Sequence, residues 1–173
     1  MVMKTKQITT DAILAALCAV LGYISIDAGN IKVTFESLPV LVAGLMFGPL
    51  DGLIVGGIGT LISQLLKYGV SATTPLWMIP YVLCGLFIGW YAKKRGFKLD
   101  RKQVIIGVAI AELIVAAFNT IALYVDSKVY GYYTAVYIFG SIPMRLLISA
   151  LKAAVFGSLL PSLTKLLKNA SRS

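Results

Sequence analysis

Residues 36–67 read ESLPVLVAGLMFGPLDGLIVGGIGTLISQLLK, and this stretch decides the fold. It is strongly apolar yet contains six glycines, which helices of soluble cores rarely carry because each glycine lowers helix stability. Gly48-Pro49 divides it into apolar runs at residues 38–47 and 53–66, because proline cannot donate a backbone hydrogen bond. Short, glycine- and proline-interrupted apolar segments are typical of membrane transporters. The alternative interpretation is a buried hairpin of a soluble protein.

The composition places the whole chain in a lipid bilayer. Of its 173 residues, 58% are hydrophobic and 13% are charged, whereas soluble domains are about 25% charged. The mean hydropathy is +0.87. This length suits a single transmembrane domain, residues 1–173, built from about six helices.

The sequence predicts an all-α integral membrane protein with six transmembrane helices, some of them short or kinked. The first begins at Thr9 or Thr10, each a good N-cap. The loop at residues 25–37 has an alternating, β-branched centre, which predicts a short strand or β-hairpin between the first two helices. A tyrosine-rich loop occupies residues 126–140. The helices are expected at residues 9/10–24, 38–47, 53–66, 74–92, 103–125 and 142–167.

The distribution of cations predicts the orientation in the membrane. Six cations lie in the loop at residues 93–102, and five more lie near the termini: Lys4, Lys6, Lys165, Lys168 and Arg172. The opposite side carries only Lys32, Lys67 and Lys128. Cytoplasmic loops are enriched in lysine and arginine, so both termini are expected in the cytoplasm. The net charge of +9 is therefore explained without a nucleic-acid partner.

Four polar residues within the last two helices suggest a buried site. Glu112 and Asn119 are seven residues apart, as are Arg145 and Lys152, so each pair shares one helix face. We expect Lys152 and Glu112 to form an ion pair, with a structural role favoured. We expect an outer cavity that attracts an anionic or polar aromatic ligand, formed by Arg145, Asn119, Gln64, Lys67 and Trp77.

Two of these assignments leave alternatives open. Arg145 either binds ligand or extends to the lipid headgroups. Gln64 and Trp77 either line the cavity or form an interfacial belt and a helix contact.

No catalytic constellation is visible. The chain has no histidine, no carboxylates paired at a useful spacing and no phosphate-binding loop. Cys18 and Cys84 both fall in apolar helices and are interpreted as packing residues. We therefore expect no enzymatic activity, no metal and no cofactor, and any ATP-driven step would need other subunits.

Small residues in the first helix predict a helix-packing groove. Ala12 and Ala16, and likewise Ala15 and Ala19, have the small-x3-small spacing that lets two helices approach closely. The groove holds either a partner protein or another helix of the same chain.

Several motifs resemble the substrate-binding (S) components of energy-coupling factor (ECF) vitamin transporters. They are ITTDAILAALCAVLG, IKVTFESLPVLVAGLMFGPLDGLIVGGIGTLI, the TTPLW start of the fourth helix and PMRLLISALKAAVFGSLLP. The resemblance covers essentially the whole chain. It is greatest to the folate-type S components, through LPVLVAG, FGPLDG and the arginine of the last helix.

The resemblance implies a function and a set of partners. An S component binds a vitamin at the outer face of a prokaryotic cell membrane and works with a transmembrane coupling protein and two ATPases. The implied ligand is folate, with cobalamin, pantothenate, riboflavin or a pyrimidine precursor as alternatives. In such a protein, the loops at residues 25–37 and 126–140 act as lids over the ligand. Phe35 and Tyr133 lie in these loops and are therefore expected to contact the ligand. The alanines of the first helix become the docking surface for the coupling protein. A small membrane enzyme and a solitary channel are the competing classes.

Overall fold

The computed structural model describes residues 5–28 and 31–170. Within these ranges the chain is mainly helical, with one two-stranded antiparallel sheet that pairs Ile26 with Val33. The predicted all-α fold is confirmed, and so is the predicted hairpin after the first helix. The short helix α6 (Ala135–Phe139) was not predicted. In chain order the elements are α1 (Thr5–Tyr23), β1 (Ile26–Ala28), β2 (Ile31–Val33), α2 (Ser37–Phe47), α3 (Pro49–Tyr68), α4 (Thr74–Lys94), α5 (Arg101–Val129), α6 (Ala135–Phe139) and α7 (Ile142–Ala170).

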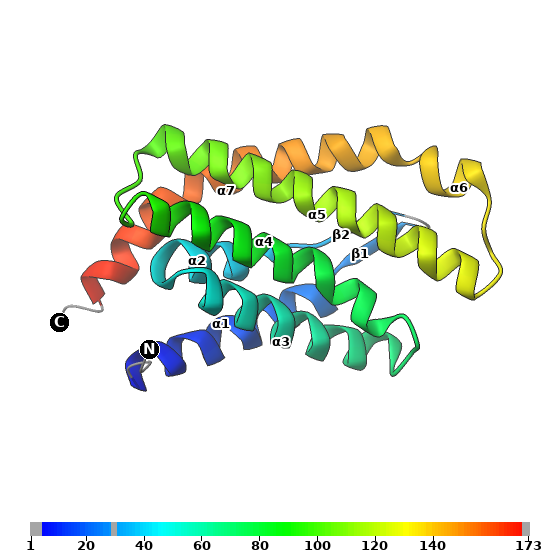
Figure 1. The fold of residues 1–173 in the computed structure, drawn as a ribbon, viewed down its shortest axis with the longest axis horizontal. Helices are drawn as coiled ribbons and strands as arrows, with labels where there is room; N and C mark the ends of the chain where they lie inside the picture. Colours follow the sequence, from blue (N-terminus) through cyan, green and yellow to red (C-terminus); the bar gives the residue numbers. More distant parts are fainter. Residues whose placement is uncertain (1–4, 29–30, 171–173) are drawn as a thin grey trace.

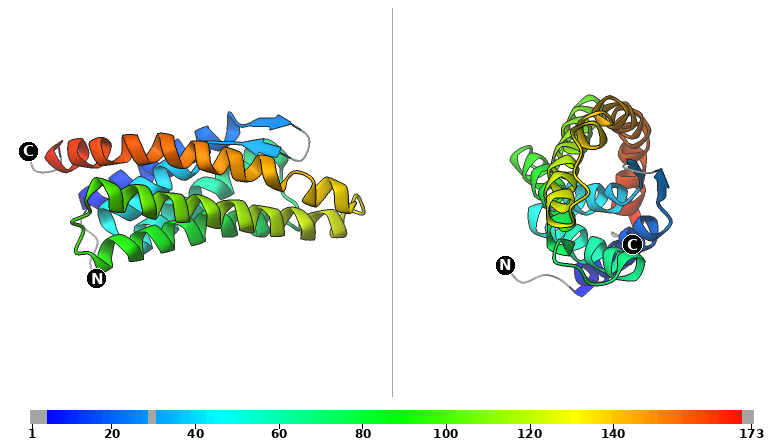
Figure 2. Two further views of the ribbon diagram at one scale, coloured as in Figure 1. Left: turned by 90° about the horizontal axis from the view of Figure 1, so that it is seen from above. Right: turned by 90° about the vertical axis from the view of Figure 1, so that its right-hand side faces the viewer.

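The helices form an elongated bundle (Figure 1). α5 and α7 lie side by side along one edge, α1 and α3 pack along the other, and α4 contacts α2, α3 and α5 between them. The start of α1, the end of α7 and the α4–α5 connection lie at one end of the bundle, while α6 lies at the opposite end (Figure 2). Residues 93–102, the start of α1 and the end of α7 therefore gather at a single end; Lys4 and Arg172 lie outside the described residues.

The described chain has four helical segments that are long and apolar enough to cross a membrane. They are Pro49–Tyr68, Thr74–Lys94, Arg101–Val129 and Ala135–Lys165. α2 is a shorter apolar helix of 11 residues. Large apolar side chains lie exposed on the outside of the bundle, including Ile13, Ile106, Leu113, Leu151 and Leu159. Such an apolar exterior suits contact with lipid chains rather than water.

Gly48 separates α2 from α3 as predicted. Its backbone has a φ of 120°, a conformation that residues other than glycine rarely adopt. Pro49 then begins α3, where its fixed φ and missing N–H suit the first helical turn.

Glycines bring α3 and α4 into backbone contact. A Cβ atom built on Gly85 would lie 2.2 Å from the carbonyl oxygen of Gly52, and one built on Gly89 would lie 2.4 Å from the backbone of Gly48. Each pair of glycines on one helix is spaced by four residues and so faces the same neighbour. The glycine density of residues 36–67 is thus a consequence of close helix packing.

Replacing Gly85 by alanine is expected to destabilise the bundle by roughly 1–3 kcal/mol, because the added methyl group meets backbone that cannot move without separating the helices. Gly57→Ala is the matched control, since its Cβ would approach no closer than 3.4 Å to a side-chain atom of Val82. Thermal unfolding of the two purified variants in detergent measures the difference. Equal melting temperatures would show that the α3–α4 contact tolerates a methyl group.

Several predicted helix ends are wrong; the third helix, for example, begins at Pro49 rather than at residue 53. α1 already includes Thr5, so Thr9 and Thr10 lie inside the helix rather than at its N-cap; their hydroxyls donate to the carbonyl oxygens of Thr5 and Lys6. α5 continues to Val129 rather than ending at residue 125, so Asp126 belongs to the helix and not to the loop.

Candidate functional site

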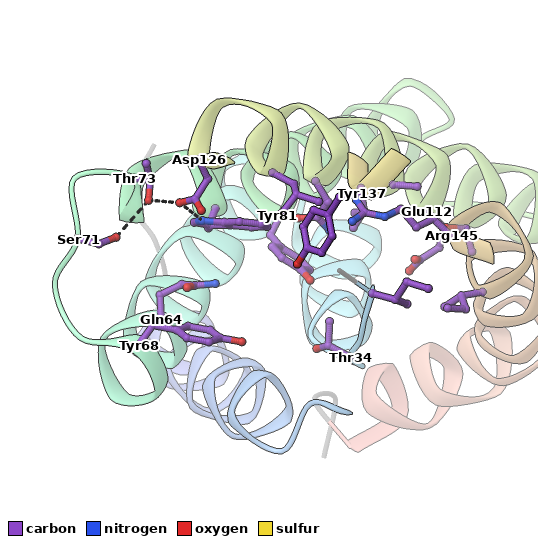
Figure 3. Close-up of a pocket in the computed structure, with 18 of the residues that line it drawn as sticks. Thr34, Gln64, Tyr68, Ser71, Thr73, Tyr81, Glu112, Asp126, Tyr137 and Arg145 are labelled. Carbon is purple, nitrogen blue, oxygen red and sulfur yellow. Dashed lines mark hydrogen bonds between the residues drawn. The ribbon is translucent and has the colours of Figure 1, made fainter. Parts of the chain in front are cut away.

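A cavity of about 450 Å³ lies among α3, α4, α5 and α7, beside the β-hairpin. This volume falls within the range of roughly 300–1,000 Å³ typical of small-molecule sites. Its walls are mostly apolar and aromatic, and Figure 3 shows labelled side chains from several elements converging on it. Its polar lining includes Gln64, Asn119, Arg145, Ser149 and Asp126, and its aromatic lining includes Trp77, Tyr81, Tyr130, Tyr132 and Tyr137.

One face of α5 carries a polar stripe along the cavity. Glu112, Asn119 and Asp126 recur every seven residues, which is two helical turns, and all three line the cavity. Asp126 was not among the predicted site residues, because the helix was expected to end one residue earlier. Asp126 could have been predicted from the sequence, because it follows Asn119 by the same seven residues that separate Asn119 from Glu112.

Asp126 fastens two loops at one end of the cavity. Its carboxylate accepts hydrogen bonds from the hydroxyls of Thr73 and Tyr132 and, at 3.5 Å, from the indole nitrogen of Trp77. Ser71 lies within 3.3 Å of Thr73 and completes the cluster (Figure 3). Burial, and then the neighbouring carboxylate, raises the pKa of Tyr132, so its hydroxyl stays protonated and donates to Asp126.

Arg145 points into the bundle. Its Nε donates to the hydroxyl of Ser141 at 3.1 Å, and its Nη1 donates to that of Thr120 on α5 at 3.2 Å. The residue is half-buried and lines the cavity. The guanidinium is therefore turned toward α5 and the cavity, and its role in ligand binding stays a prediction.

Lys152 and Glu112 lie together as expected. Lys152 Nζ is 2.7 Å from Glu112 Oε2, and their side chains are 10% and 1% exposed. Both residues line the cavity. Among the described residues, neither carboxylate oxygen receives a hydrogen bond of ordinary geometry.

The predicted binding residues divide into two groups. Arg145, Asn119, Gln64 and Trp77 all line the cavity. Three others are absent from its lining and make different contacts. Lys67 donates to the carbonyl and hydroxyl oxygens of Ser25. Phe35 packs against the ring of Phe156, with centroids 6.0 Å apart. The ring of Tyr133 lies 5.6 Å from that of Tyr124 and 3.6 Å from Lys128 Nζ.

Glu36 positions the hairpin beside the cavity. It is fully buried and accepts hydrogen bonds from Thr34 at 3.1 Å and from Ser63 on α3 at 2.8 Å. Thr34 follows β2 and lines the cavity, so Glu36 links the hairpin to the helical frame. Sequence reasoning missed this role, because a single acidic residue before an apolar helix looks like an exposed loop residue.

The four alanines of α1 occupy two different environments. Ala15 and Ala19 are 5% exposed and buried inside the bundle, and the carbonyl oxygen of Ala15 would lie 2.9 Å from a Cβ on Gly59. Ala12 and Ala16 are exposed. A shallow apolar groove between α1 and α3 includes Ala16 and Ala19 in its lining. Ala15 and Ala19 thus pack within the bundle, whereas docking of a partner protein at Ala12 and Ala16 stays a prediction.

The described residues contain no group of three His, Cys, Asp or Glu side chains that could hold a metal ion. Cys18 and Cys84 are fully buried, and the Cys18 thiol lies 3.4 Å from the carbonyl oxygen of Glu36. Together, the membrane-length helices and the mostly apolar cavity with a few polar groups in its wall define a membrane-embedded small-molecule-binding protein.

Comparison with known proteins gives the family. Residues 6–165 match the model of the ECF transporter, substrate-specific component, family. The chain therefore belongs to the family of substrate-specific components of ECF transporters.

Solved structures share the fold. The S component of a bacterial ECF transporter is 26% identical, with a TM-score of 0.68 over 96% of this chain and 99% of that chain. FolT bound with folic acid is 21% identical, with a TM-score of 0.69 over 95% and 97% of the two chains. The S component for biotin from an ECF-type ABC transporter is 19% identical, with a TM-score of 0.61 over 91% and 94%.

Sequence relatives include UPF0397 proteins of Streptococcus pneumoniae. The one from strain ATCC BAA-255 / R6 is 33% identical over 132 residues, and the one from serotype 19F (strain G54) is 31% identical over the same length. These alignments cover 73% of this chain and 65% of each relative.

Proposed function

We propose that the protein binds a vitamin or related micronutrient with high affinity at the outer face of a prokaryotic plasma membrane and delivers it into the cell as the S component of an ECF transporter. The observation that carries this proposal is the cavity of about 450 Å³ with Arg145 and Asn119 in its wall. A transmembrane coupling protein and two ATPase subunits are the proposed partners, and ATP is hydrolysed by them.

Folate is the proposed ligand. Its flat heteroaromatic ring suits the faces of Trp77 and the tyrosines that line the cavity, because aromatic rings pack favourably in stacked or edge-to-face arrangements. Arg145 suits a carboxylate or a ring acceptor, since its planar fork offers several donors in a fixed geometry. Cobalamin, pantothenate, riboflavin and a pyrimidine precursor are the alternative ligands within the same role.

Equilibrium titration of the purified protein in detergent tests this function. We expect saturable binding of folate well above that of the other four compounds. Tight binding of one of the other four compounds would change the proposed ligand, and the proposed role as an S component would stand. Failure to bind any vitamin, in a protein that remains folded, would contradict the proposed function.

The proposed orientation places both termini and residues 93–102 in the cytoplasm. It is supported by the cations gathered at the end of the bundle that holds the start of α1, the end of α7 and the α4–α5 connection. In intact cells, a membrane-impermeant thiol reagent is expected to label Lys128→Cys but not Lys98→Cys; Cys18 and Cys84 are buried and should stay silent. Labelling of Lys98→Cys from outside would reverse the topology.

A further inference from the structure

The ion pair between α5 and α7 lies in the wall of the cavity. Glu112 is 1% exposed, lines the cavity, and has neither oxygen in a hydrogen bond of ordinary geometry among the described residues. A buried acceptor left in this state is costly, and more so when it is charged. Ionisable groups within membrane helices generally face a cavity and serve a function.

On their own two helices, the neighbours of the pair in the cavity wall are mostly apolar. One turn along α5 from Glu112, the cavity is lined by Val115 and Ala116, and one turn along α7 from Lys152 it is lined by Ile148 and Ser149. Of these four side chains, only the Ser149 hydroxyl carries a donor.

The spacing of the two charged atoms defines a recognition pattern. Lys152 Nζ and Glu112 Oε2 form an ion pair, with the two atoms 2.7 Å apart. Glu112 supplies further acceptor positions on both oxygens, and the ammonium group of Lys152 supplies up to three donors. A ring N–H next to a ring carbonyl presents the complementary order of donor and acceptor at a similar separation.

We propose that Glu112 and Lys152 form the specificity site of the cavity and bind a heterocycle through a ring N–H and an adjacent ring carbonyl, as found in lactams and cyclic ureides. The N–H donates to Glu112 and the carbonyl accepts from Lys152. This inference rests on the proposed function and deepens it: Arg145, two turns along α7 from Lys152, then binds a second acceptor of the same ligand.

The test separates recognition from a purely structural pair. The double variant Glu112→Leu/Lys152→Met removes both charges together, which leaves no buried charge without a partner and is often tolerated by a protein core. Ser158→Ala, an exposed position on α7 outside the cavity lining, is the control. Thermal unfolding without ligand checks that each variant folds.

Binding is measured by titration with two groups of probes. Folate, riboflavin and biotin carry a ring N–H beside a ring carbonyl; pantothenate, cobalamin and an aminopyrimidine do not. We expect the wild-type protein and Ser158→Ala to bind a member of the first group most tightly. We expect the folded double variant to lose a hundred-fold or more of that affinity.

Three results would overturn the inference. Affinity of the double variant within three-fold of wild type would make the pair structural only. If the wild-type protein binds a probe of the second group most tightly, Glu112 and Lys152 do not recognise a ring N–H beside a ring carbonyl. The proposal of vitamin binding would still stand. A folded wild-type protein that binds none of the six probes would remove the proposed function together with the inference.

Discussion

Arg145→Ala is expected to weaken binding of the ligand about ten- to a hundred-fold. The guanidinium is half-buried and held by Ser141 and Thr120, so it is already oriented before a ligand arrives. Hydrogen bonds that involve a charge are worth roughly 1.5–3 kcal/mol, and each 1.4 kcal/mol corresponds to about a factor of ten in the dissociation constant. Equilibrium titration of the purified variants with folate, or with the vitamin that wild type prefers, measures the loss.

Two further variants sharpen this result. Arg145→Lys is expected to recover only part of the affinity, because a compact ammonium cannot reproduce the planar fork of a guanidinium. Lys128→Ala removes a cation that lies over the rings of Tyr124 and Tyr133 and is absent from the cavity lining, so it should change little. If Arg145→Ala binds as tightly as wild type, the arginine makes no contact with the ligand.

Local rules predicted most of the helical frame. The Gly48-Pro49 break, the proline start of α4 and the β-hairpin each follow from the backbone preferences of one or two residues. The many glycines of residues 36–67 also indicated a membrane protein, and in the structure they allow close packing of α3 against α4. The end of α5 was misjudged because Asp126 resembles a loop residue; in the structure, donors from α4 and the α5–α6 loop compensate its charge.

The site was predictable where polar residues interrupt apolar helices. Asn119 and Arg145 were identified in this way, because a polar side chain inside a membrane must face something other than lipid. Tyr81 and Thr73 carry no such signal; they line the cavity because of how α4 packs against α5. Lys67 shows the converse, since it lies one turn from the cavity-lining Gln64 but donates to Ser25.

Ala16→Trp is expected to abolish vitamin uptake by the complete transporter while leaving ligand binding by the isolated protein unchanged. Ala16 is exposed and borders the apolar groove between α1 and α3, on a surface that the proposed coupling protein would cover. Helices meet closely only where side chains are small, and an indole would hold a partner helix several ångströms away. Uptake of radiolabelled vitamin in cells and titration of the purified subunit measure the two effects separately.

The control for Ala16→Trp must add the same bulk to a different face. Ala154 is also exposed but lies on α7, so Ala154→Trp should retain both uptake and binding. Ala15 is unsuitable because it is 5% exposed, and an indole there would disrupt the bundle itself. Loss of binding together with uptake in Ala16→Trp would mean that this alanine supports internal packing. Unchanged uptake would place the docking surface elsewhere on the bundle.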